Sequence, residues 1–117
     1  VDIIGLDMYD RTYVGQTRVQ PPLLQTYLND PNSGMLFVRD FARAHRKPMG
    51  ISEWGLSSKH VPGVNPDNTL FIQKMVEFVR ANNLSYANYF EDDSNYRHRL
   101  MLHYPQSAAL YKRLLAQ

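Results

Sequence analysis

The sequence predicts an α/β fold with a parallel sheet, because three short strand-like segments alternate with three longer segments of helical periodicity over 117 residues. The resulting order is β-α-β-α-β-α. Strands that alternate with helices over short connections pair in parallel and are joined by right-handed crossovers. A chain of this length is large enough for one modest core, so we expect a single domain over residues 1–117.

The predicted strands are three short apolar segments rich in β-branched or aromatic residues. The first contains VDIIGL and covers residues 1–8. The second, PMGISEW, covers residues 48–54, and the third, LSYANYF, covers residues 84–90. Each is predicted to end in a polar stretch, and these stretches read LDMYD, SEWG and NYFEDD.

The predicted helices place apolar residues three or four positions apart and carry recognisable ends. The first is SGMLFVRDFARAH, for which Ser33 is the expected N-cap. The second, NTLFIQKMVEFVRANN, starts near residue 67 or 68 and stops near residue 82 or 83. The last runs from Pro105 to about Leu115, and proline is a favourable first residue of a helix.

The spacing of these elements favours part of a (β/α)8 TIM barrel over other parallel folds. Such a barrel uses roughly 31 residues for each unit, so three units take about 94 residues and leave the rest for longer loops. Functional side chains of a barrel gather where each strand ends and its loop begins, and polar stretches follow all three predicted strands. A doubly wound sheet would usually carry a Gly-rich phosphate turn after a strand, and the sequence has none.

Composition excludes several classes of partner and site. The formal net charge is only +2, and the 13 Lys and Arg are scattered among 11 acidic residues. The sequence therefore lacks the cluster of basic residues that is typical of nucleic-acid-binding proteins. It has no Cys, which excludes disulfides and thiolate zinc sites, and no apolar run approaches the roughly 20 residues of a membrane helix. The chain opens within a strand-like run and without Met, so we expect it to be part of a longer protein.

Glu53 is the leading candidate for a chemical role. Side chains alternate along a strand, so Met49, Ile51 and Glu53 are predicted to share one face, with Glu53 at its open end. A carboxylate at the mouth of a barrel is partly desolvated and can serve as nucleophile, base or acid. The alternative is a Glu that pairs with a loop Arg or faces solvent.

Asp7 and Tyr9 have the same parity in the first strand, so we expect them to reach the mouth at which Glu53 lies. A Tyr hydroxyl there can hydrogen-bond a nucleophilic carboxylate and keep it ionised. Two alternatives stay open: Tyr9 only packs, and Asp7 binds the backbone of its own loop.

Aromatic residues at the predicted strand ends are candidates for binding a sugar, because sugar rings have apolar faces that rigid aromatic surfaces bind at low entropic cost. Trp54, Tyr89, Phe90 and Tyr13 lie at or just beyond strand ends, and Asn88 shares a strand face with Phe90. With eight Tyr in the chain, the alternative for each aromatic residue is an ordinary core or surface position.

No metal or cofactor is predicted. His98 and His103 lie five residues apart, which is not the spacing of a helical zinc pair, and a solvated loop is the preferred interpretation. The stretch EDDSN lacks the Gly and the distal Glu of an EF-hand loop. No Ser lies in a G-x-S-x-G turn.

Taken together, VDIIGLDMYD, RKPMGISEWGL and LSYANYFEDD resemble, in this order, the sixth, seventh and eighth strands of (β/α)8 glycoside hydrolases. The likeness is strongest to the family 26 mannanase-like group of the large retaining clan, clan A, and covers nearly the whole chain. Its most specific element is the pattern FxxxHxKPxxxxEWG, which leads into the second predicted strand.

This resemblance implies a secreted or periplasmic enzyme that hydrolyses a β-linked polysaccharide with retention and needs no cofactor. Glu53 matches the nucleophile of the family, and Tyr9 matches the Tyr that positions it. A second carboxyl group about 5 to 5.5 Å away would act as acid and then as base. Phe90 falls where the family usually places an aromatic platform, commonly Trp, under the sugar.

The chain departs from the family in one respect, because the acid/base of this clan stands at the end of strand four and the likeness begins at strand six. Glu91, Asp92 and Asp93 follow the wrong strand to replace it. We therefore expect the 117-residue chain alone to be inactive, and its uncovered sheet edges to pair with the missing N-terminal part of the barrel or to self-associate.

Two other functions stay open at this level. One is a non-catalytic barrel module that binds polysaccharide through Trp54, Tyr13 and Phe90. The other is a different (β/α)8 enzyme that uses Glu53 as a general base. The resemblance leans toward β-1,4-mannan as the substrate, and β-1,3 or mixed-linkage glucan and xylan stay open.

Overall fold

The computed structural model describes residues 1–12, 28–58 and 65–117. Its strands and helices alternate in the predicted order, with one additional short helix before the last. The strands are β1 (Ile4–Thr12), β2 (Met49–Ser58) and β3 (Ala87–Tyr89). The helices are α2 (Met35–Ala44), α3 (Thr69–Asn82), α4 (Leu100–His103) and α5 (Pro105–Leu115).

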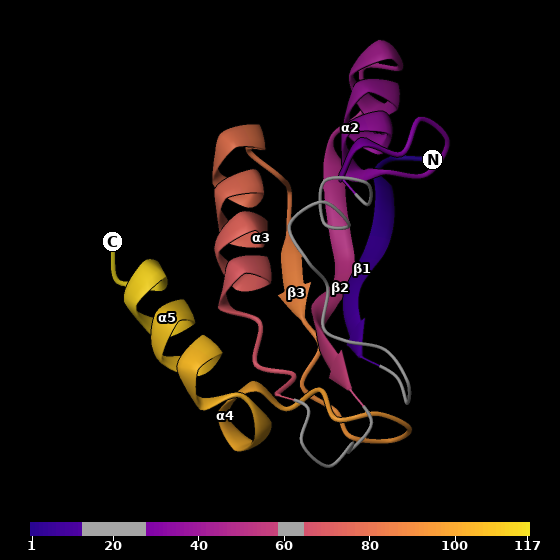
Figure 1. Ribbon diagram of the computed structural model, residues 1–117. Helices are drawn as coiled ribbons and strands as arrows, with labels where there is room; N and C mark the ends of the chain where they lie inside the picture. Colours follow the sequence, from indigo (N-terminus) through magenta and orange to yellow (C-terminus); the bar gives the residue numbers. More distant parts are fainter. Residues whose placement is uncertain (13–27, 59–64) are drawn as a thin grey trace.

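The sheet confirms the predicted parallel α/β class. Its order is β1-β2-β3, and both pairs are parallel, so each strand lies beside the next one along the chain (Figure 1). Each connection returns the chain to the same end of the sheet, as β-α-β units require. Three such units are compatible with a segment of a barrel, and a barrel itself requires further strands.

The first two strands extend further than the sequence predicts, because β1 and β2 remain paired with each other up to Thr12 and Ser58. The SEWG stretch therefore lies inside β2, and the prediction that it ends this strand was wrong. The pairing of β2 with β3 is shorter, and beyond it the Phe90 N–H donates to the Trp54 carbonyl at 2.9 Å. Glu53 thus lies near the end of the three-stranded part of the sheet.

A β-bulge in β2 changes which side chains share a face. The register with β1 skips one residue between Ile51 and Glu53, so Ser52 has no partner in β1. Ile51 and Trp54 consequently both point into the core, with 0% and 1% of their surface exposed, and Glu53 lies on the face opposite Trp54. The predicted face of Met49, Ile51 and Glu53 was wrong, because simple alternation does not continue through a bulge.

Helix α2 begins differently from the prediction. Gly34 is its N-cap and no side chain bonds the first turn, so the assignment of Ser33 as the cap was wrong. The Ser33 N–H donates instead to a carboxylate oxygen of Asp30 at 3.1 Å, in a turn that precedes the helix. Met35 and Ala42 are the buried residues of α2.

The ends of α3 confirm the prediction. The Asn68 side chain accepts a hydrogen bond from the Phe71 N–H at 3.2 Å, which satisfies one of the free donors of the first turn. At the other end Asn83 adopts the left-handed conformation, with φ 49° and ψ 56°. Pro105 starts α5 as expected, and the buried Asp67 carboxylate accepts from the backbone N–H groups of Gln106 and Ser107.

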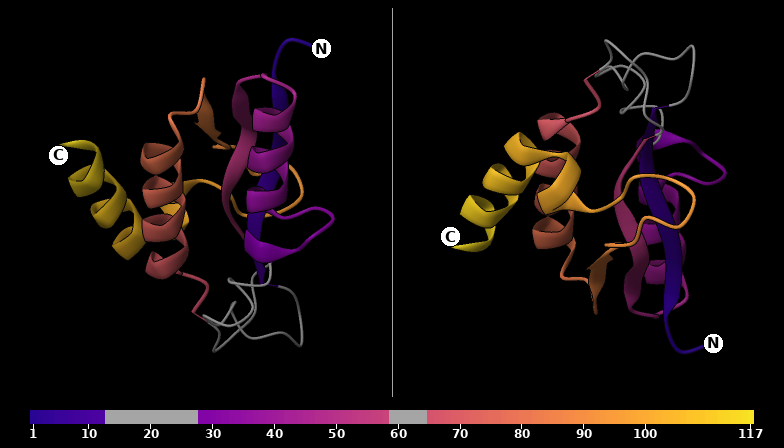
Figure 2. Two further views of the ribbon diagram at one scale, coloured as in Figure 1. Left: turned by 90° about the horizontal axis from the view of Figure 1, so that it is seen from above. Right: turned by 90° about the horizontal axis from the view of Figure 1, so that it is seen from below.

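The hydrophobic core lies between the sheet and the helices. Helix α3 contacts both β2 and α5, and Figures 1 and 2 show α5 beside α3, on the side away from β1. The largest fully buried apolar side chains are those of Trp54, Tyr104, Phe71, Met35, Ile51, Leu56, Ile72 and Met75. The opposite face of β1 and β2 carries the polar side chains described next.

Candidate active site

A hydrogen bond joins the two leading candidates. The Tyr9 hydroxyl of β1 donates to a Glu53 carboxylate oxygen of β2 at 2.7 Å, and both residues are half-buried. This distance is typical of an O–H bond to a charged acceptor. The predicted proximity of Tyr9 and Glu53 is therefore confirmed, and Tyr9 does more than pack.

Asp7 lies beside Glu53 as predicted, and its carboxylate contacts the Glu53 backbone and not the backbone of its own loop. One of its oxygens accepts from the Glu53 backbone N–H at 3.1 Å. The β-bulge leaves this amide without a regular strand partner, and the Asp7 side chain takes that place. Asp7 is thus an exposed residue that supports the backbone on which Glu53 stands.

Two rings, those of Phe90 and His98, pack against the Tyr9 ring. The Phe90 ring meets the Tyr9 ring edge-on, with centroids 6.2 Å apart, and the His98 ring lies 5.2 Å from Tyr9 and 5.0 Å from Phe90. His98 is only 7% exposed, so its assignment to a solvated loop was wrong. The sequence gives no periodic signal for His98, because it lies in an irregular segment after β3 that only the tertiary structure brings beside β1.

Trp54 does not belong to this site. Its ring is 1% exposed and packs against Phe71, Tyr89 and Tyr111 at centroid distances of 6.5, 5.1 and 5.6 Å. Its expected role in binding a sugar beside Glu53 was therefore wrong, since its side chain points to the opposite face of the sheet. Burial raises the pKa of both Tyr89 and Tyr111, as expected for hydroxyl groups near this core.

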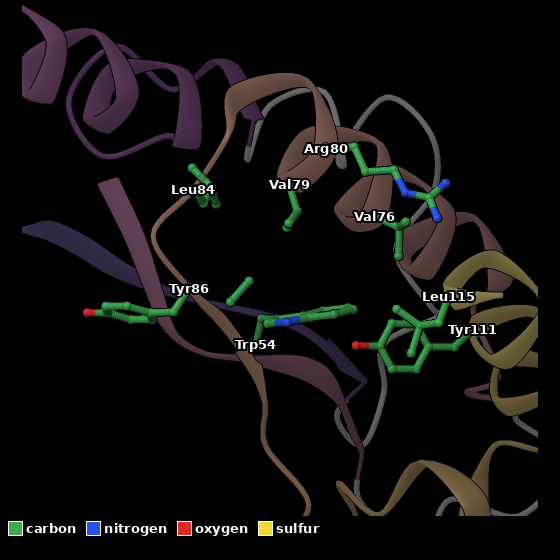
Figure 3. Close-up of a pocket in the computed structure, with 9 residues that line it drawn as sticks. Trp54, Val76, Val79, Arg80, Leu84, Tyr86, Tyr111 and Leu115 are labelled. Atoms are coloured by element: carbon green, nitrogen blue, oxygen red, sulfur yellow. The ribbon is translucent and has the colours of Figure 1, made fainter. Parts of the chain in front are cut away.

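An apolar pocket of about 300 Å³ opens on the Trp54 side, where α3, α5 and β3 meet. Figure 3 shows the Trp54 ring between Tyr86 and Tyr111, with Val76 and Val79 of α3 beside it. None of the titratable groups paired with Glu53 lines this pocket, so it is separate from the candidate active site.

The other two predicted binding residues are not brought to the Glu53–Tyr9 pair. Asn88 of β3 is exposed, and its side chain makes no hydrogen bond within the described part of the chain. Tyr13 lies outside the described residues. Of the residues predicted to bind substrate, Asp7 and Phe90 are those that the structure places around Tyr9 and Glu53.

The acidic residues after β3 organise their own loop. Glu91 accepts from the Leu100 N–H at 2.8 Å, and Asp93 accepts from the N–H groups of His98 and Arg99. Asp93 also pairs with His103 at 2.8 Å. Desolvation opposes ionisation of Asp93, yet these hydrogen bonds prevail and hold its pKa at about 2.

Other indications of function are few. Among the residues that the structure describes, no group of three or more His, Asp or Glu is suited to hold a metal ion. In the same residues no helix combines the length and apolar character needed to cross a membrane. Comparisons with protein-family models and with curated proteins found no match to the chain.

Proposed function

We propose that the chain carries the nucleophile of a retaining glycoside hydrolase that acts on a β-linked polysaccharide. The observation that carries this proposal is the 2.7 Å hydrogen bond from the Tyr9 hydroxyl to the Glu53 carboxylate, on the face of the sheet opposite Trp54. A carboxylate held in one orientation by an O–H donor is suited to attack a carbon centre, since little reorganisation precedes the reaction.

In the proposed reaction a Glu53 oxygen attacks the anomeric carbon while the bond to the leaving oxygen breaks. A second carboxyl group protonates that oxygen, and a covalent glycosyl-enzyme forms. The second carboxylate then takes a proton from water, the water oxygen bonds to the anomeric carbon, and Glu53 is released. Tyr9 holds the attacking carboxylate, and Phe90 is an apolar surface beside the Tyr9 ring.

The second carboxyl group is proposed to come from polypeptide outside these 117 residues. The nearby acids already have other hydrogen bonds: Asp7 accepts from the Glu53 N–H, and Glu91 and Asp93 accept from the loop backbone. The chain alone is therefore proposed to lack turnover. The remaining barrel is the proposed partner, and it would cover the β3 edge and the pocket around Trp54.

A polysaccharide-binding module without catalysis has less support, because Trp54, one of its three expected aromatic contacts, is buried in the core. The substrate class follows from the sequence resemblance, which favours β-1,4-mannan or a β-glucan. The same resemblance supports a secreted or periplasmic location.

The test uses an activated 2-deoxy-2-fluoro-glycosyl fluoride, with the manno and gluco compounds as separate probes. Fluoride leaves without a proton, so the trapping step needs only the nucleophile. We expect intact-mass spectrometry to show one added fluoroglycosyl group, and peptide mapping to locate it on Glu53. Glu53→Gln should abolish the adduct, and the matched control Glu91→Gln should retain it.

A general-base enzyme would show no adduct, because its Glu53 never bonds to the sugar. The proposal is contradicted if the wild-type chain stays unmodified with both probes, or if Glu53→Gln is modified as fast as wild type.

A further inference from the structure

The C-terminal end of β2 is paired with β1 but extends beyond β3 on its other side, and this determines how His98 is held. Strand β3 ends at Tyr89, whereas β2 continues to Ser58. The backbone N–H of Leu56 donates to the Tyr89 hydroxyl at 3.2 Å, and the Leu56 carbonyl contacts His98 Nδ1 at 3.1 Å. Two side chains therefore satisfy the backbone groups of Leu56 that a longer β3 would have paired.

These contacts fix His98 from three directions. Its backbone carbonyl accepts from the Tyr89 hydroxyl at 3.1 Å, and its backbone N–H donates to Asp93 at 2.9 Å. Its ring is anchored at Leu56, and because a carbonyl only accepts, Nδ1 must carry the proton. His98 therefore has its backbone N–H, its backbone carbonyl and its ring each in a hydrogen bond, although it lies in an irregular loop.

The anchored ring lies against Tyr9. The His98 and Tyr9 centroids are 5.2 Å apart at an interplanar angle of 53°, and Phe90 contacts both rings edge-on. Tyr9 contacts both of these rings, which also contact each other, and its hydroxyl is the group that bonds Glu53. Removal of one neighbour would allow the Tyr9 ring to tilt, and small displacements at a reacting group reduce rate strongly.

We propose that His98 is a positioning residue that acts through Tyr9 on Glu53. The expected effect of His98 on the reaction rate rests on the proposed function, whereas its effect on the orientation of Tyr9 does not. His98 touches neither a reacting atom nor the Glu53 carboxylate in the contacts described, so its effect passes through the orientation of the Tyr9 hydroxyl.

The test compares wild-type chain with His98→Asn. Asn can still donate to the Leu56 carbonyl but has no ring to pack on Tyr9. The matched control is His45→Asn, because His45 also bonds a carbonyl through Nδ1 and stacks on Phe41 at 4.1 Å, but lies exposed at the end of α2. Two readouts are used: the rate of fluoroglycosyl labelling, and the NMR shift of the Tyr9 ring carbon that bears the hydroxyl.

We expect His98→Asn to slow labelling by about tenfold and to move the Tyr9 carbon signal toward that of a solvated Tyr, with His45→Asn unchanged. In a Tyr9→Phe background the same His98 substitution should add no further slowing, because the group it positions is gone. Unchanged labelling and an unchanged Tyr9 signal in folded His98→Asn would overturn the proposal, as would full additivity with Tyr9→Phe.

Failure of the proposed function is distinguishable from failure of this inference. If wild-type chain is not labelled, the NMR arm alone decides whether His98 orients Tyr9. If His98→Asn does not fold, as judged by circular dichroism, His98→Gln replaces it, and the same shift of the Tyr9 signal is expected. A Tyr9 signal that stays at its wild-type position in the folded variant refutes the role of His98.

Discussion

Two neighbouring residues of β2, Glu53 and Trp54, show how the two faces of the sheet differ. Glu53 is half-buried and bonded to Tyr9, on a face with Asp7, whereas Trp54 is 1% exposed among the rings of the helical layer. On the Trp54 face, burial of apolar side chains stabilises the fold. On the Glu53 face, hydrogen bonds hold polar groups in a defined geometry. A substitution on the first face should therefore lower stability, and one on the second should leave stability nearly unchanged.

The largest expected effect is at Trp54. Trp54→Ala should lower the free energy of unfolding by about 3 to 5 kcal/mol, because it leaves a large cavity in a packed core. Glu53→Gln should change it by less than about 0.5 kcal/mol, since Gln can accept from Tyr9 in the same way. Urea denaturation followed by circular dichroism measures both, and equal losses would refute the division between the faces.

Trp54→Phe sharpens the same comparison. Within the described residues, the buried Trp54 Nε1 has no hydrogen-bond partner, so replacing the indole ring by a phenyl ring breaks no hydrogen bond. The variant should lose less than half of the stability that Trp54→Ala loses. A Phe variant as unstable as the Ala variant would mean that the indole N–H contributes a contact of its own.

The next effect is expected at Gly55, where β2 passes under Tyr89. A Cβ on Gly55 would lie 3.0 Å from the ring carbon that bears the Tyr89 hydroxyl. Tyr89 is held at that hydroxyl by Leu56 and His98, so its ring has little freedom to retreat. Gly55→Ala should cost about 1 to 3 kcal/mol in the same denaturation assay, as overpacked sites do.

In alkaline solution the loss of stability should depend on Tyr104. Burial raises the pKa of Tyr104 from 10.0 to about 12, although Ser58 donates a hydrogen bond to its hydroxyl. Between these values the unfolded state loses this proton and the folded state keeps it, so stability is complete below about pH 10 and falls toward pH 12. Tyr104→Phe should remove part of this slope, and buried Tyr89 and Tyr111 should account for the rest.

The smallest effect is expected in acid, at Asp93. Its pKa in the folded protein is about 2, below the ordinary 3.8, so its contribution is present above about pH 4 and is lost as the pH falls to about 2. The side chain is 29% exposed, which screens the interaction and keeps the effect small. Asp93→Asn should flatten this part of the curve of stability against pH, and His45→Asn should not.

Local patterns in the sequence predicted much of the fold. The apolar spacing of α3, its Asn68 cap and the Pro105 start of α5 depend on neighbours within one or two turns, so the sequence alone indicates them. The alternation of strand-like and helix-like segments indicated the parallel sheet. In the site, the equal parity of Asp7 and Tyr9 correctly indicated that both reach Glu53.

Contacts between distant segments caused the failures. Strand length was underestimated because β1 and β2 support each other beyond the apolar run. The shared face of Ile51 and Glu53 was predicted wrongly because a bulge depends on the register with another strand, and no pattern within β2 reports it. His98 was missed because its partners Leu56 and Tyr9 are supplied by other strands.

The sequence by itself determined the α/β order and the ends of α3 and the start of α5, since these follow from propensity, periodicity and side-chain chemistry over short distances. The tertiary structure alone decided the orientation of Glu53, the burial of Trp54 and the place of His98. The physical reason is that a bulge, a packed ring and a side chain that completes an unpaired backbone each require a partner brought close only by folding.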